Sequence, residues 1–314
     1  MRSKFIGFYK EDFIDKEELL KKATIIVDTN VLLDVYRYSR ETANQILQML
    51  ESIKGQLWMP YQVAYEYHKD RNDKVLGEHI RTYSQFIKKI DDFENLFNKE
   101  RKHPFLDGND VIALQQNLTA IKDILCRGKE NCSQLIREDE YKSRIADLYE
   151  NRLGEDYSEE DKIKYKKEAQ TRYEKQIPPG YKDSNKDSNG CGDYLIWRQM
   201  IDLAKSKNCP LIFVSNDTKE DWIEEVAGIK IGPRPELIDE FYRETNQLFY
   251  CYDFDQFINI LNTRVVTKEA KEEIEMRLKE QQQTNPIMGE AMPTSSPLEI
   301  YLGDTTSSQS IAEI

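Results

Sequence analysis

The chain has 314 residues, of which 39% are hydrophobic and 32% are charged, so it is long enough for one large domain or two ordinary ones. It contains no apolar run close to the roughly 18 residues that a membrane-spanning helix needs, and its five cysteines include no CxxC pair. The net charge of −12 argues against a protein that coats nucleic acid nonspecifically, but it does not exclude an enzyme acting on nucleic acid. These features predict a cytoplasmic protein with reduced cysteines and no membrane partner.

The first part of the chain predicts alternating helices and strands. The expected elements are a helix over 11–22, a strand over 24–28, a helical stretch from Asn30 to about Gly55, a strand over 56–59 and a helix from Tyr61 to about Arg71. Pro60 suits the first turn of the last of these helices, because its fixed φ is compatible with a helix start.

A long polar segment, rich in Lys and Glu, follows over residues 72–177. Its heptad-like apolar positions, including Phe86, Ile90, Phe93 and Leu96, predict a helical hairpin or small bundle. Residues 181–192 are rich in Gly, Ser, Asn and Asp, so we expect a loop there.

The strand pattern then resumes. The expected elements are a helix over 193–205, a strand over 211–214, a helix over 217–226 and a strand near 248–252. Strands that alternate with helices indicate an α/β fold with a mostly parallel sheet. The sequence therefore predicts a discontinuous α/β domain over 1–71 and 178–264, with residues 72–177 as a helical insertion.

The C-terminal residues 265–314 differ in composition from the rest of the chain. They hold four basic and nine acidic residues, and a charged helix gives way to a Gln-rich and then Pro-, Ser- and Thr-rich end. We expect this acidic tail to be largely flexible. Within it, residues 298–302 have the pattern of a strand that can add to a partner's sheet.

Five acidic residues lie near predicted junctions between strands and helices. They are Asp28, Glu66, Asp193, Asp217 and Asp221. The carboxyl ends of parallel strands meet at one edge of a sheet, where α/β proteins bind their ligands. Aspartates at helix starts are also ordinary N-caps, so each acid taken alone has a structural interpretation.

The acids taken together favour a metal site. Oxygen ligands suit Mg²⁺ or Mn²⁺ better than zinc, and three or four carboxylates can hold one or two such ions. Ions of this kind activate a water and neutralise the charge that develops on a scissile phosphate. Without a cation the clustered carboxylates would repel one another.

The sequence resembles the PIN-domain nucleases, in particular a bacterial PIN-like branch with a long helical insertion. The segments that carry the resemblance are IIVDTNVLLDVYRYS at 25–39, WMPYQVAYEYHKDR at 58–71, PPGYKD at 178–183, GDYLIW at 192–197, VSNDTKEDW at 214–222 and GPRPELI at 232–238. The resemblance implies a three-layer α/β/α sandwich with a central parallel sheet. It also implies hydrolysis of phosphodiesters, usually in single-stranded RNA, with bound Mg²⁺ or Mn²⁺.

The family's acidic positions match four residues of this chain. The resemblance assigns catalysis and metal binding to Asp28, Glu66, Asp193 and Asp217. Asp221 matches an acid common in this branch and is a further candidate metal ligand. The small polar residues beside these acids are expected to support them: Thr29, Asn30 and Ser215.

Four basic residues in or beside the same segments are candidate contacts for the substrate's phosphates: Lys182, Lys186, Lys219 and Arg234. They are as readily interpreted as solvated loop residues.

These observations favour a metal-dependent endoribonuclease that acts as a toxin or an anti-phage defence effector. A partner such as an antitoxin or an ATPase is expected to control it. Assembly as a homo-oligomer stays open as an alternative to a monomer. DNA is an alternative substrate. A phosphatase of the haloacid dehalogenase type also places Asp after its first strand, but it needs a second Asp where this chain has Asn30. A third alternative is a non-catalytic binding or assembly module whose acids only cap helices.

Overall fold

A computed structural model of the chain describes residues 1–100, 106–183, 190–217, 219–227 and 229–284. Its centre is a parallel sheet in the order β1–β2–β5, formed by Thr24–Val27, Leu211–Val214 and Phe249–Tyr252. The register places Val27 beside Val214 and Val214 beside Tyr252, so the three strands end together. The strands predicted from the sequence at these three places are confirmed.

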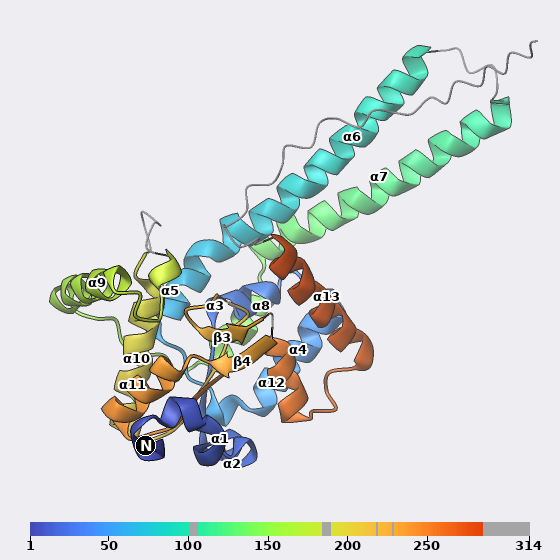
Figure 1. Cartoon of the computed structure of the whole chain (residues 1–314). Helices are drawn as coiled ribbons and strands as arrows, with labels where there is room; N and C mark the ends of the chain where they lie inside the picture. The colour runs from blue at the N-terminus through green and yellow to red at the C-terminus, as the bar shows by residue number, and fades with distance from the viewer. Residues whose placement is uncertain (101–105, 184–189, 218, 228, 285–314) are drawn as a thin grey trace, which may run out of the picture.

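Helices cover both faces of this sheet. Strands β2 and β5 are buried along their whole length, which is typical of parallel strands enclosed between two layers. One group of contacting helices is α5 (Tyr61–Asp70), α10 (Gly192–Lys207) and α11 (Pro235–Thr245). The other contains α4 (Arg40–Ser52), α8 (Glu140–Leu148), α12 (Phe254–Leu261) and α13 (Lys268–Thr284), and Figure 1 shows α10 and α11 on the opposite side of the molecule from α4, α12 and α13. The predicted α/β class is confirmed.

The N-terminal helices are shorter than their sequence patterns predict. The region 11–22 divides into α1 (Lys10–Phe13) and α2 (Lys16–Lys22), because Asp15 caps α2 by accepting hydrogen bonds from the N–H groups of Glu17 and Glu18. In the same way, Ser39 begins α4 and separates it from α3 (Thr29–Asp34).

The strand predicted over 56–59 is reduced to two isolated parallel bridges. Leu57 pairs with Ile25 of β1, and Met59 pairs with Leu153. Pro60 follows directly and precedes α5. Because proline has no N–H to donate to a ladder, the strand pairing cannot continue past this point.

The polar segment after α5 has two structural parts. A π-helical stretch, Arg71–Gly77, leads into α6 (Glu78–Glu100) and α7 (Gly108–Arg137), which form the long hairpin that projects from the body in Figure 1. In contrast, α8 and α9 (Glu159–Glu174) contribute buried side chains to the main core, including Ile145 and Ala169. The domain boundaries drawn from the sequence stay a prediction.

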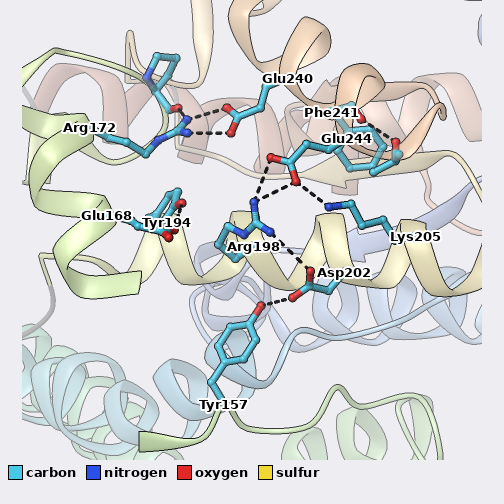
Figure 2. A network of polar contacts seen from close by, with 12 residues as sticks. Tyr157, Glu168, Arg172, Tyr194, Arg198, Asp202, Lys205, Glu240, Phe241 and Glu244 are labelled. Atoms are coloured by element: carbon cyan, nitrogen blue, oxygen red, sulfur yellow. Dashed lines mark hydrogen bonds and ion pairs between the residues drawn. The ribbon is translucent and has the colours of Figure 1, made fainter. Parts of the chain in front are cut away.

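Polar contacts join α9, α10 and α11, as Figure 2 shows, and Tyr194 of α10 donates a hydrogen bond to Glu168 of α9 at 2.9 Å. Arg198 of α10 lies 3.1 Å from Glu244 of α11. Arg172 of α9 lies 2.6 Å from Glu240 of α11 and also donates a hydrogen bond to the carbonyl oxygen of Pro178. Through Arg172, the loop at 178–180 is held beside α9 and α11.

The helix predicted over 217–226 is absent, and this prediction was wrong. The chain forms a turn after β2 and then an antiparallel hairpin of β3 (Ile223–Val226) and β4 (Ile229–Pro233). The alternating β-branched residues of this segment favour extended backbone. Asp217 also accepts a hydrogen bond from the N–H of Lys219, a local turn that competes with helix formation.

The final described helix, α13, belongs to the packed body. Its side chains Ala270, Ile274 and Leu278 are buried, and it contacts α4 and α12. The strand expected over 298–302 and most of the expected flexible tail lie outside the described residues. Among the helices that the structure describes, none is both long enough and apolar enough to cross a bilayer.

Candidate active site

Asp28 lies at the point where β1 ends and α3 begins. Its backbone N–H donates to the carbonyl oxygen of Val214 at 2.9 Å, which continues the pairing of β1 with β2 by one residue. Its side chain caps α3 by accepting a hydrogen bond from the N–H of Thr29 at 2.7 Å. Asp28 is 9% exposed, so a carboxylate stands almost buried at the carboxyl edge of the sheet.

Two polar side chains hold the second oxygen of this carboxylate. Oδ2 of Asp28 accepts hydrogen bonds from Oγ of Ser215 at 2.6 Å and from Nδ2 of Asn30 at 2.7 Å. The Ser215 oxygen in turn accepts from Nδ2 of Asn30 and from the N–H of Asp217, both at 3.0 Å. The expected supporting residues therefore fix the orientation of Asp28.

Glu66 reaches the same place from α5. Its Oε2 accepts a hydrogen bond from Oγ1 of Thr29 at 3.2 Å, and its Oε1 accepts from Nε2 of Gln62 at 2.8 Å. Thr29 thus connects the carboxylates of Asp28 and Glu66, which lie on different elements.

Asp217 lies in the turn after β2. Its Oδ2 is 2.7 Å from Nζ of Lys219, while its backbone is tied to Ser215. Because the helix predicted over 217–226 is absent, Asp217 and Asp221 do not lie one turn apart on a helix, as that prediction implied. The two acids nonetheless interact, since burial raises the pKa of Asp221 and the charge of Asp217 raises it further.

Asp221 and Asp193 lie on either side of the loop at Gly180. Oδ2 of Asp221 accepts hydrogen bonds from the N–H groups of Gly180 at 2.9 Å and Lys182 at 3.3 Å, and Asp221 has no exposed surface. A Cβ on Gly180 would lie 3.2 Å from Cβ of Asp193 and 2.5 Å from the Tyr173 hydroxyl. Only glycine, here at φ +93°, allows the loop to pass this closely beside Asp193.

The electrostatics of the site centre on Asp28. Burial, and then the charges of Glu66 and Asp217, raise the pKa of Asp28 from 3.8 to about 7, although the hydrogen bond from Ser215 lowers it. Burial raises the pKa of Cys191 at the start of α10, and the charge of Glu66 makes a smaller contribution in the same direction. Asp28 is thus close enough to Glu66 and to Asp217 for their charges to repel its own, and the start of α10, which carries Asp193, lies near Glu66.

A comparison with protein families identifies the domain that carries these acids. The model of a PIN like domain matches residues 24–237, which include all five acids. The chain belongs to the PIN-like domain family. No curated protein and no solved structure matches it.

PIN-like domains are generally nucleases, so membership of the family places this chain in a nuclease superfamily. Oxygen donors suit Mg²⁺ or Mn²⁺. Burial is the main cause of the raised pKa of Asp28, and the repulsion from Glu66 and Asp217 that adds to it is the kind that a bound cation relieves. Within the described residues no three His, Cys, Asp or Glu side chains are arranged around a common point as metal ligands. The carboxylate of Asp28 is engaged by hydrogen bonds and that of Asp217 by Lys219. Their donor chemistry fits a hard divalent cation.

The PIN-like domain also contains a buried acid that the sequence analysis missed. Asp34 is 1% exposed and accepts hydrogen bonds from Nδ2 of Asn216 at 3.1 Å and from Nε2 of Gln281 at 2.9 Å. Asn216 donates its N–H to Oδ1 of Asn30 at 3.0 Å. Asp34 therefore links α13 to the residues that orient Asp28. Its place six residues after Asp28, in the same DTNVLLD segment, was an available signal.

The cations expected to meet phosphates are paired with acids. Lys182 lies 2.6 Å from Glu220, and Arg234 lies 2.9 Å from Glu236. Lys219 is the partner of Asp217 described above, and Lys186 lies outside the described residues. Lys182, Lys219 and Arg234 therefore form ion pairs within the protein. Their role toward substrate stays a prediction.

Proposed function

We propose that this PIN-like protein is a metal-dependent endonuclease that hydrolyses phosphodiesters in single-stranded RNA. The observation that supports it is the convergence of Asp28, Glu66 and Asp217 from three elements on one edge of the parallel sheet. Helix caps that served structure alone would have no reason to meet: Asp15, for example, caps α2 by using only local N–H groups.

The proposal gives each acid a part. Asp28, Glu66 and Asp217 hold the cation, with Asp193 as a further ligand from the start of α10 and Asp221 as the residue that positions the Gly180 loop beside it. The bound ion supplies an activated water and charge stabilisation at the phosphate. Ser215 and Asn30 orient the Asp28 carboxylate for this task through hydrogen bonds of 2.6 and 2.7 Å.

The same proposal extends to biological role. An unregulated ribonuclease is hazardous to its own cell, so we infer a controlled toxin or defence effector. The contact of Gln281 with Asp34 gives α13 a physical connection to the site, through Asn216 and Asn30. A regulatory partner that binds the acidic C-terminal segment would therefore act on residues that support Asp28.

The nuclease proposal is tested with a mixed pool of single-stranded RNA, in parallel with single-stranded DNA and double-stranded RNA. Wild type is expected to cleave the single-stranded RNA only when Mg²⁺ or Mn²⁺ is added, and Asp28→Asn to lose at least about 100-fold of the rate. Equal cleavage by wild type and Asp28→Asn would contradict the proposal. Preferential cleavage of DNA would overturn the choice of RNA.

A second candidate role, as an assembly module, is favoured by the α6–α7 hairpin. No residue of α7 is buried, and large apolar side chains stand exposed on the hairpin, including Phe93, Leu96 and Ile124, between 47% and 59%. Exposed apolar surface of this kind marks interaction sites. Light scattering of wild type and Phe93→Ser tests this: a homo-oligomer that becomes a monomer in the variant supports it, and a wild-type monomer argues against self-assembly.

A further inference from the structure

A cavity of about 380 Å³ adjoins the candidate active site. It lies at the carboxyl end of β5, under the β3–β4 hairpin and against α12, and Ser215 forms part of its wall. Since the same Ser215 hydroxyl donates to Asp28, the cavity begins one side chain away from the proposed catalytic carboxylate. Its volume falls at the lower end of the roughly 300–1,000 Å³ that small-molecule sites occupy.

Two lysines line this cavity without an acidic partner. Lys16 of α2 and Lys230 of β4 form no ion pair among the described residues, in contrast to Lys182, Lys219 and Arg234. The ammonium group of Lys16 instead lies 5.4 Å from the ring centroid of Tyr250. Unpaired cations beside a polar cavity are the residues expected to meet a phosphate.

The interior of the cavity offers aromatic and hydrogen-bonding groups. The rings of Tyr250 and Tyr252 lie 4.6 Å apart and both line it. Tyr252 is only 3% exposed, and its hydroxyl has no hydrogen-bond partner among the described residues. A buried hydroxyl without a partner is costly, so this position calls for a ligand that accepts or donates a hydrogen bond there. The backbone at Gly232 has φ +138°, and a Cβ there would lie 3.1 Å from the Tyr250 hydroxyl, so glycine keeps the wall open.

We propose that this cavity binds one nucleotide unit of the substrate strand, next to the phosphate that is cut. Lys16 and Lys230 contact the phosphate of that unit, and the base enters between the β4 wall and the tyrosines to reach the Tyr252 hydroxyl. That the bound nucleotide belongs to a substrate strand rests on the proposed nuclease function. Nucleotide binding in this cavity is tested independently of it. It assigns phosphate contact to two lysines that are absent from the segments used to recognise the family acids.

The binding arm uses the four nucleoside 5′-monophosphates as probes, with ligand-observed NMR on the full chain. Wild type is expected to give saturation transfer with at least one of them, and Lys16→Ala/Lys230→Ala and Tyr252→Phe to weaken binding by about 5-fold or more. Lys21→Ala is the matched control, because Lys21 is an exposed residue of the same helix as Lys16 and does not line the cavity. No binding by wild type, or equal binding by all variants, would overturn the inference.

The kinetic arm separates this inference from the nuclease proposal. With single-stranded RNA, Lys16→Ala/Lys230→Ala is expected to raise KM about 10-fold with little change in kcat. It should also lower the slope of log KM against log salt by about 0.7, because both lysines contact the same phosphate and one phosphate contact is lost. If Asp28→Asn abolishes cleavage while the cavity variants match Lys21→Ala in KM and salt slope, the cavity inference fails and the nuclease proposal stands. If Asp28→Asn cleaves as wild type does, the nuclease proposal fails, and the monophosphate titration still decides whether the cavity binds nucleotides.

Discussion

Ser215 donates a hydrogen bond from Oγ to Oδ2 of Asp28 at 2.6 Å, across 187 residues of sequence. The bond joins the ends of two neighbouring parallel strands, β1 and β2, and is the shortest of the contacts that orient the carboxylate. It also stabilises the charged form of Asp28 against burial and the neighbouring acids. The pH behaviour of the protein should therefore depend on this pair.

Nuclease activity is expected to rise with pH through about 7. The pKa of Asp28 is raised to about 7, mainly by burial, so below that pH the group carries a proton that blocks a cation. A rate profile from pH 5.5 to 8.5 at low Mn²⁺ measures this, and because Mn²⁺ competes with the proton the midpoint should shift lower as Mn²⁺ rises. A profile that is flat across this range at low Mn²⁺ would contradict the assignment.

Replacing Ser215 with Ala should move the same profile upward. The substitution removes a donor to a charged group, worth about 1.5–3 kcal/mol, so the pKa of Asp28 should rise by about one unit or more. Activity at pH 7 should fall about 10-fold and recover in part at pH 8.5. Ser215→Thr keeps the hydroxyl and serves as the control. A midpoint unchanged in Ser215→Ala would show that the bond does not tune Asp28.

Asp28→Asn should change how stability depends on pH in metal-free protein. The folded-state pKa of Asp28, about 7, lies above its ordinary value of 3.8, so its carboxylate costs stability as pH rises from about 4 to 7. Between pH 5 and 8 this costs the wild type about 3 kcal/mol that Asp28→Asn does not lose. Urea unfolding at both pH values measures the difference. Equal losses in the two proteins would contradict the raised pKa.

The sequence predicted the strands that position the site, β1 and β2, but not the turn that follows β2. The β-branched run before Asp28 and the apolar run before Ser215 each form buried strands, because apolar residues enclosed on both faces leave little choice of local structure. The helix prediction over 217–226 failed, since the side chains of Ser215 and Asp217 accept hydrogen bonds from nearby backbone N–H groups and residues 223–226 pair with β4 instead.

Convergence was also partly predictable. The positions of the acids near predicted strand–helix junctions predicted that they meet at one edge of the sheet, and the family resemblance added catalysis and metal binding by Asp28, Glu66, Asp193 and Asp217. Nothing local to Lys16 or Lys230 predicts that they share a cavity, because α2 and β4 meet only through tertiary packing.

Asp34 was missed because an acid within a helical apolar pattern is ordinarily taken to be solvated, whereas here Asn216, Gln281 and two arginines surround it.

Helix α13 is expected to be part of the folded body. Ile274 is fully buried, so Ile274→Ala should lower the free energy of unfolding by about 2–4 kcal/mol. Met276→Ala, on the same helix but 60% exposed, should change it by less than about 0.5 kcal/mol. Denaturant unfolding of both variants gives the comparison, and equal effects would place α13 outside the cooperative unit.

The central claim is that acids distant in sequence form one cation site, and calorimetric titration with Mn²⁺ tests it most directly. Asp15 provides the control, because it caps α2 as Asp28 caps α3 but has no acidic neighbour in the site. We predict that wild type and Asp15→Asn bind Mn²⁺ alike, and that Asp28→Asn and Asp217→Asn each lose at least about 10-fold in affinity. Equal Mn²⁺ affinity in all four proteins, or no binding by wild type, would contradict the account.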